Sequence, residues 1–253
     1  MGAGHTHLLH RPGTSPVHRL APQVKVVCAL VFVLCVVSTR RVEFWAFGGY
    51  LLVLAGVWLI ARIPPGWLAK RALIEVPFVV LAVALPFIGG GPQVDVLGVS
   101  VSEEGTLAGW NIFIKGTLGV LVSLTLAATT APRELIVGLQ RLRVPAMIIT
   151  IATLMLRYLE VIAAEARRMR IARICRGHDP RFLWQVAATA RGVGTLFIRS
   201  YERGERVHLA MVSRGWVGAM PDTLPTVIGR STWMAGLVPA ALAVVVLGVS
   251  LWA

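Results

Sequence analysis

Two short arginine-containing segments are the residues of this sequence best suited to bind a partner. The first is Cys175-Arg176-Gly177 and the second is Ser213-Arg214-Gly215, and each combines a small residue, an arginine and a glycine. Each follows a basic segment of helical character. A glycine beyond the last helical turn supplies a left-handed residue, and an arginine there complements the helix dipole. An arginine that projects from a helix end can also hydrogen-bond to carboxylates in an acidic groove of a soluble partner.

Helix termination and partner docking are both open explanations for these segments. Termination alone is sufficient to explain a single copy. Two copies, 38 residues apart, favour the docking interpretation. We therefore treat all six residues as a candidate docking site, namely Cys175, Arg176, Gly177, Ser213, Arg214 and Gly215.

The elements that must position this site are basic and helical. Residues 133–216 contain fifteen arginines and six acidic residues, which is most of the net charge of +13. Such a block is expected on the cytoplasmic side of a membrane. Spacings of three and four residues predict an amphipathic helix with one apolar face, formed by Met155, Leu159, Ile162, Ala166 and Met169. A second helix is predicted over 196–214.

The rest of the chain is apolar enough to be embedded in a lipid bilayer. Hydrophobic residues make up 56% and charged residues 15%, which excludes a disordered chain and a free-standing nucleic-acid-binding domain. Six apolar segments are near the length of a membrane span: 24–38, 44–60, 72–88, 112–131, 144–164 and 233–252. The predicted fold class is all-α, a polytopic membrane protein with five to six transmembrane helices plus long cytoplasmic amphipathic helices. Whether 144–164 crosses the membrane stays open, because it contains Arg157 and Glu160.

Loop charges predict the orientation of the first spans. Residues 61–71 carry Arg62, Lys70 and Arg71, whereas 89–111 carry acidic residues and no lysine or arginine. By the positive-inside rule the first loop and the N-terminal tail are cytoplasmic and the second loop is external. Two charges fall inside spans, Glu75 and Lys115. We expect them at opposite membrane faces, with their charged ends extended to the interface.

The domain organisation follows from these segments. We expect a polar cytoplasmic N-terminal tail over 1–23 and a membrane bundle of about four helices over 24–131. A basic coupling region over 132–230 and a C-terminal transmembrane helix over 231–253 complete the chain.

Histidines near the N-terminus are the candidates for metal binding. His5, His7 and His10 could hold a transition metal through imidazole nitrogens. The alternative is a mobile polar tail without convergent ligands, so no metal site and no cofactor is predicted. The three cysteines have no metal-type spacing and imply no disulfide framework.

The sequence resembles the transmembrane T component of energy-coupling factor (ECF) transporters. That family carries two Ala-Arg-Gly-like signatures at the ends of coupling helices, and the two arginine segments match them with cysteine or serine in place of alanine. A His-Arg-Leu-x-Pro-x-x-Lys opening before the first span is also similar, here His18 to Lys25. Nearly the whole chain is covered, and the similarity is strongest to CbiQ-type subunits of cobalt importers.

The resemblance implies a scaffold that joins other proteins in the cell membrane. Its expected partners are two cytoplasmic ATP-binding subunits and a substrate-binding membrane subunit, with no nucleic acid. Arg176 and Arg214 would each enter a groove of one ATPase, and cobalt ion would be the substrate. The chain has no G-x-x-x-x-G-K-[ST] loop, so ATPase activity is expected in the partners and not in this subunit. The alternatives are the same role for nickel or a vitamin, a membrane enzyme or a standalone channel.

Overall fold

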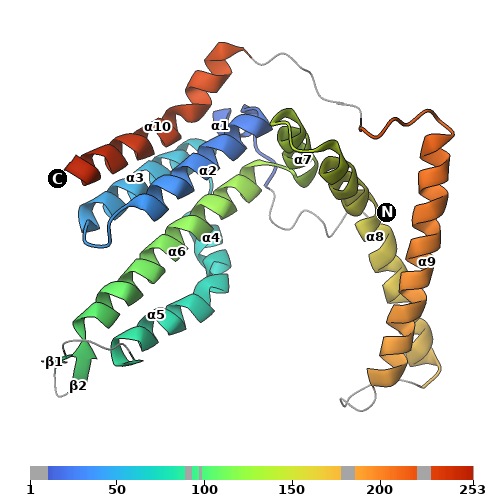
Figure 1. The fold of residues 1–253 in the computed structure, drawn as a ribbon, viewed down its shortest axis with the longest axis horizontal. Helices are drawn as coiled ribbons and strands as arrows, with labels where there is room; N and C mark the ends of the chain where they lie inside the picture. Colours follow the sequence, from blue (N-terminus) through green and yellow to red (C-terminus); the bar gives the residue numbers. More distant parts are fainter. Residues whose placement is uncertain (1–10, 89–92, 97–98, 178–185, 221–228, 253) are drawn as a thin grey trace. The chain divides into compact units, whose positions relative to one another are not determined.

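The computed structural model describes residues 11–88, 93–96, 99–177, 186–220 and 229–252. It divides into two compact units. We call residues 2–138 together with 224–253 the bundle unit, and residues 139–223 the hairpin unit. Figure 1 labels the elements of both, and each unit is described by itself.

The bundle unit begins with a short helix and two long apolar ones. Helix α1 covers Pro16–Arg19, α2 covers Pro22–Ser38 and α3 covers Phe44–Ala61. Proline occupies the first turn of α1 and α2, where its missing N–H costs no helical hydrogen bond. At the end of α3, Arg62 adopts a left-handed conformation with φ of 54°, which reverses the chain.

The third predicted span is a broken helix. Helix α4 (Pro65–Ala72) passes through a single 3₁₀ turn, η1 (Leu73–Glu75), into α5 (Val76–Ile88). Pro77 follows the break directly, and a proline ring cannot donate to the preceding helical turn.

The predicted loop over 89–111 contains more regular structure than expected. A short antiparallel hairpin pairs β1 (Gln93–Val96) with β2 (Val99–Ser102), and α6 begins immediately afterwards and covers Glu103–Thr129. The Ser102 hydroxyl accepts a hydrogen bond from the Gly105 N–H, which caps α6. Two glutamates in the first turn favour the helix dipole, so the helix starts well before its apolar part.

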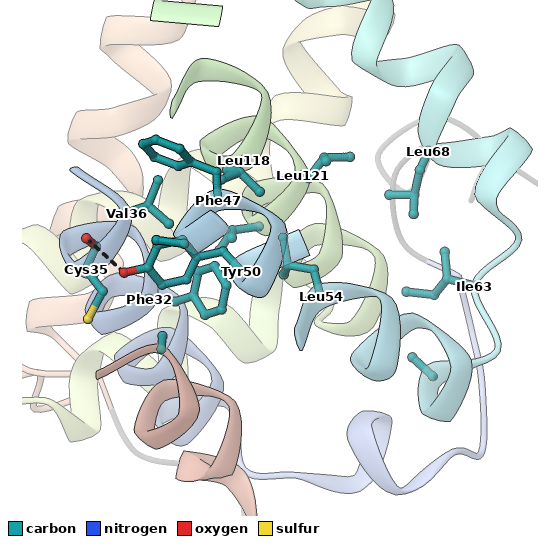
Figure 2. Packing of buried hydrophobic residues seen from close by; sticks show 14 of the residues in the cluster. Phe32, Cys35, Val36, Phe47, Tyr50, Leu54, Ile63, Leu68, Leu118 and Leu121 are labelled. Atoms are coloured by element: carbon teal, nitrogen blue, oxygen red, sulfur yellow. Dashed lines mark hydrogen bonds between the residues drawn. The ribbon is translucent and has the colours of Figure 1, made fainter. Parts of the chain in front are cut away.

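The core of the bundle unit lies between α2, α3 and α6. Figure 2 shows Phe32, Tyr50 and Leu118 among its members. Tyr50 is completely buried; its ring meets that of Phe32 edge-on at 5.6 Å, and its hydroxyl lies 2.9 Å from the Thr39 hydroxyl. Helix α10 (Arg230–Trp252) packs along α2 and α3, and α5 packs along α6 (Figure 1).

Small residues allow α5 and α6 to approach closely. A Cβ atom added at Gly105 would lie 2.5 Å from the carbonyl oxygen of Leu85, and one at Gly109 would meet the carbonyl oxygen of Ala82 even more closely. Helices in membranes commonly pack through such small-residue faces.

The remaining helices lead into and form the hairpin unit. Helix α7 covers Pro132–Arg141, α8 covers Ala146–Cys175 and α9 covers Val186–Val212. In the described residues, five helices or helix pairs are long and apolar enough to cross a membrane, and α2 is slightly shorter. The predicted all-α, polytopic fold class is confirmed, and the short β1–β2 hairpin is a strand pair that the sequence did not predict.

Candidate docking site

Helices α8 and α9 form an antiparallel pair. The Glu165 carboxylate accepts hydrogen bonds of 2.7 Å from Arg168 on its own helix and from Arg199 on α9. These two bonds lower the pKa of the Glu165 carboxyl, which lies beyond the apolar half of α8. Towards the other end of α9, Met211 lines the same groove as Leu154 of α8. The start of α8 therefore meets the end of α9.

The first arginine segment ends α8 with the geometry of a helix terminator. Gly177 has φ of +77° and its N–H donates to the Ile174 carbonyl at 2.9 Å. The Arg176 N–H donates to the Arg173 carbonyl at 3.1 Å. A left-handed residue at this position is accessible to glycine without steric cost. Hydrogen bonds thus fix the backbone of this segment, while the side chains of Cys175 and Arg176 are exposed.

The second segment ends α9 in the same way. Gly215 has φ of +81° and its N–H donates to the Val212 carbonyl at 2.9 Å, while the Arg214 N–H donates to the Met211 carbonyl at 3.1 Å. The Trp216 N–H donates back to the Met211 carbonyl at 3.0 Å, which completes the turn. Ser213 and Arg214 are exposed. Both segments therefore hold an exposed arginine on a fixed helix end.

The two arginines lie at opposite ends of the hairpin unit. Because α8 and α9 are antiparallel, Arg176 follows one end of the pair and Arg214 the other. Helix α9 has 27 residues. At 1.5 Å per residue this separates the two helix ends by about 40 Å. One small binding site cannot contain both side chains, whereas two separate partner surfaces can.

An apolar groove of about 570 Å³ lies between the start of α8 and the end of α9. Thr150 and Trp216 line it, and the Thr150 hydroxyl and the Trp216 indole N–H are buried without a hydrogen-bond partner. The His208 ring meets Trp216 edge-on at 5.9 Å. Sequence reasoning missed this groove because its residues come from two helices and the turn after α9.

The predicted apolar face of α8 is only partly the face that packs against α9. Ile162 contributes to the groove, but Met155 and Leu159 are 66% and 53% exposed. Three further residues of α8 line the groove, namely Ile151, Leu154 and Tyr158. Two helical faces of α8 are apolar, and periodicity alone did not show which one meets α9.

The expected separation of Glu75 and Lys115 is wrong. The Glu75 carboxylate is buried and accepts a hydrogen bond of 3.0 Å from the Thr117 hydroxyl, beside Gly116 of α6. Both charges thus lie at the same level of α6, on different sides of it. The Lys115 ammonium donates to the carbonyls of Val37 (2.7 Å) and Thr39 (2.8 Å) at the end of α2. Because α4 begins at Pro65 and α6 at Glu103, earlier than the predicted spans, Glu75 lies opposite the middle of α6.

The opening from Ser15 to Lys25 is ordered by its own side chains. The Ser15 hydroxyl caps α1 by accepting from the His18 N–H at 3.4 Å. The ring of His18 donates from Nε2 to the Arg11 carbonyl at 3.2 Å, so its Nδ1 accepts from the Ser15 hydroxyl at 2.7 Å. The resemblance pointed to these residues without giving them a role.

The metal-ligand candidates His5, His7 and His10 lie outside the described residues. Among the residues that the structure does describe, no group of three histidine, cysteine or acidic side chains is arranged to hold a metal ion. Cys28 is partly buried and Cys35 is buried, while Cys175 is exposed at the end of α8.

Comparisons with known proteins agree with this architecture. The family CbiQ, cobalt transport protein, matches residues 13–227. The chain is 30% identical over 196 residues to the cobalt transport protein CbiQ of Rhodobacter capsulatus, which covers 75% of this chain and 78% of that protein. It is 27% identical over 221 residues to the energy-coupling factor transporter transmembrane protein EcfT of Bacillus selenitireducens, with 82% of each chain covered. The EcfT of Acidaminococcus fermentans is 26% identical over 250 residues, with 91% of each chain covered. This chain therefore belongs to the CbiQ family of cobalt transport proteins and is a multi-pass bacterial membrane protein of the ECF transporter T-component type.

Proposed function

We propose that this chain is the coupling subunit of an ECF-type importer that takes up cobalt ion. It joins two cytoplasmic ATPase subunits to a substrate-binding membrane subunit, and ATP is hydrolysed in the partners. One observation carries the proposal: two exposed arginines, Arg176 and Arg214, stand on similarly terminated helix ends at opposite ends of one hairpin. This arrangement suits two equivalent partner surfaces about 40 Å apart.

The proposal requires that α8 does not cross the membrane. Helix α8 has 30 residues and is about 45 Å long, more than the roughly 30 Å hydrocarbon core. If α8 spanned the bilayer, the antiparallel α9 would bring Arg214 to the side opposite Arg176. Both arginines can meet cytoplasmic partners only if the hairpin unit lies along the cytoplasmic surface. The arginines spread along both helices favour that location.

The groove between α8 and α9 supports a further, apolar partner. It contains two buried donors without acceptors, on Thr150 and Trp216. Buried polar groups normally have hydrogen-bond partners. A membrane subunit that presents apolar side chains and a free carbonyl oxygen would complete this surface, and the substrate-binding subunit is the occupant that we propose.

Cobalt is proposed as the substrate because the matched family and the relative from R. capsulatus are named for cobalt transport. Nickel or a vitamin is the alternative, since the EcfT relatives have names that specify no substrate. Uptake of radiolabelled cobalt by cells that express the complex, with competition by excess nickel, distinguishes the two ions.

The docking role is tested with a double charge reversal. We expect Arg176→Glu together with Arg214→Glu to leave the chain in the membrane but to abolish co-purification with the ATPase subunits and ATP-driven uptake. The matched control is Arg170→Glu with Arg206→Glu, which changes the net charge equally at exposed positions within the same helices. Full assembly and uptake in the first double variant would overturn the docking role.

A labelling experiment tests the orientation independently. Cys175 is already exposed beside Arg176, and Ser213→Cys places a thiol beside Arg214. A membrane-impermeant maleimide should modify both positions in inside-out vesicles and neither in right-side-out vesicles. Labelling from opposite sides would show that α8 spans the bilayer and would contradict the proposed arrangement.

A further inference from the structure

The N-terminal opening makes hydrogen bonds to the end of α6. We use the name N-terminal clamp for Arg11, Ser15, His18 and Lys25 together with their acceptors at Ala128 and Thr129. Lys25 is the centre of the clamp. Its ammonium group is buried and donates to the carbonyls of Thr129 (2.8 Å) and His18 (3.1 Å).

The contact between Lys25 and Thr129 stabilises a helix end. Thr129 is the last residue of α6, and the final carbonyls of a helix have no helical partner. A buried ammonium group that donates to such a carbonyl satisfies both groups and complements the negative end of the helix dipole. The same ammonium holds the carbonyl of His18, so α1 and the end of α6 are joined through one atom.

A second connection reaches the same helix end. The Arg11 N–H donates to the Ala128 carbonyl at 3.0 Å, and the His18 ring donates to the Arg11 carbonyl at 3.2 Å. His18 therefore contributes to both connections, through its ring to Arg11 and through its carbonyl to Lys25. Residues 11–25 hold the last two residues of α6 from two directions.

The helix that follows is fixed against the same segment. Helix α7 begins at Pro132, and a Cβ atom added at its Gly138 would lie 3.0 Å from the backbone nitrogen of Gln23 and 3.0 Å from Cβ of Pro22. A side chain at position 138 would therefore push α7 and the start of α2 apart by a few tenths of an ångström. One residue later, at Leu139, the chain enters the hairpin unit.

We propose that the N-terminal clamp positions the junction between α6 and α7 so that movement of the hairpin unit is transmitted to the bundle unit. Lys25, His18 and Gly138 are positioning residues in this proposal, which rests on the proposed coupling function. Without the clamp, the junction between α6 and α7 is free to bend. Movement of the hairpin unit, driven by the ATPases, would then bend this junction and would not reach the bundle unit. The subunits still assemble, because the docking arginines lie in the hairpin unit.

The test measures how many ions are taken up for each ATP hydrolysed. In the complex reconstituted with its ATPase and substrate-binding subunits, Lys25→Met keeps the length of the side chain and removes the ammonium group. We expect co-purification of the ATPases to be unchanged and cobalt uptake per ATP to fall about tenfold, as for the loss of charged hydrogen bonds. Lys70→Met, at an exposed lysine of α4, is the matched control and should keep the full ratio.

A reversible cross-link separates positioning from any other role of the ammonium group. Arg11→Cys and Ala128→Cys allow a disulfide between two residues that already share a backbone hydrogen bond, in a chain whose native cysteines are changed to serine. When added to Lys25→Met, this pair should restore the coupling ratio under oxidising conditions and lose it again on reduction. Failure of the oxidised form to recover would overturn the positioning role.

A second variant keeps the test decisive if Lys25→Met does not assemble. Gly138→Val should push α7 away from the start of α2 and lower the ratio in the same way, whereas Gly119→Val has open space and should not. Unchanged coupling ratios in Lys25→Met or Gly138→Val, beside an active unmodified complex, would overturn the clamp alone. An unmodified complex with no ATP-driven uptake would instead overturn the proposed function.

Discussion

The bundle unit and the hairpin unit differ in how far their side chains are buried. The bundle unit buries large residues almost completely, including Phe47 and Tyr50, and its buried Lys25 and Glu75 have hydrogen-bond partners within the unit. Helix α8 buries only Ile149 and Thr150, and α9 buries none of its described side chains. Apolar side chains such as Phe197 and Leu209 are 70% and 67% exposed.

Both units expose large apolar side chains, among them Leu59 and Ile74 of the bundle unit, so the difference between them is the buried core that α2, α3 and α6 form in the bundle unit. In the bundle unit, Lys25 and Lys115 each donate to two backbone carbonyls, so their ammonium groups connect separate helices through hydrogen bonds. In the hairpin unit the arginines are mostly exposed, and the apolar groove is open. Large exposed apolar surfaces commonly mark sites of interaction with proteins or membranes. The following variants test that contrast.

The largest effect is expected in the bundle unit. Gly109→Leu places side-chain atoms where the Ala82 carbonyl oxygen lies, so α5 and α6 must separate. We expect a destabilisation of at least about 3 kcal/mol, enough to prevent a monodisperse peak in size-exclusion chromatography in detergent. Gly119→Leu, on the same helix with open space around it, is the control and should elute normally. Equal profiles for both variants would contradict the close packing of these helices.

Single charge reversals in the hairpin unit should have an intermediate effect. Arg176→Glu or Arg214→Glu alone leaves the other contact in place, so the affinity for the ATPase subunits should fall about tenfold without complete loss. The measurement is a pull-down titrated with purified ATPase subunits. If either single variant behaves like the double variant, the two ends do not act as separate contacts.

A smaller effect is expected from changes of glycine to alanine. Gly177→Ala and Gly215→Ala introduce a Cβ atom at positive φ and should each destabilise the helix end by about 1 kcal/mol. Gly204→Ala, inside α9 with open space, should instead stabilise the helix by up to about 1 kcal/mol. Thermal unfolding followed by circular dichroism measures both. The same sign at all three positions would contradict the terminator geometry.

No effect on uptake is expected from the N-terminal histidines. Replacing His5, His7 and His10 with alanine should leave cobalt uptake unchanged, because residues 1–17 include no cysteine or acidic residue that could support them as ligands. Uptake at limiting cobalt concentration is the measurement. A lower uptake rate would give these residues a role in metal delivery.

Much of the fold could be predicted because its signals are local. Runs of apolar residues predicted the helices, and the two Arg-Gly segments predicted helix ends with left-handed glycines, which Gly177 and Gly215 confirm. The early start of α6 was missed because Ser102 and two glutamates begin the helix before its apolar part. The level of Glu75 was missed because α4 begins at Pro65 and α6 at Glu103, both well before the apolar segments that predicted them, so Glu75 and Lys115 lie inside these helices and not near their ends.

The sequence by itself determined that the chain is helical, membrane-embedded and basic over residues 133–216, because hydropathy, charge and helix caps act over a few residues at a time. Only the tertiary structure decided that the two arginine segments lie at opposite ends of one antiparallel pair. It also decided that Lys25 reaches the end of α6, 104 residues away. Those contacts depend on how separate helices pack against one another, and the spacing of residues along one helix does not specify which neighbour it meets.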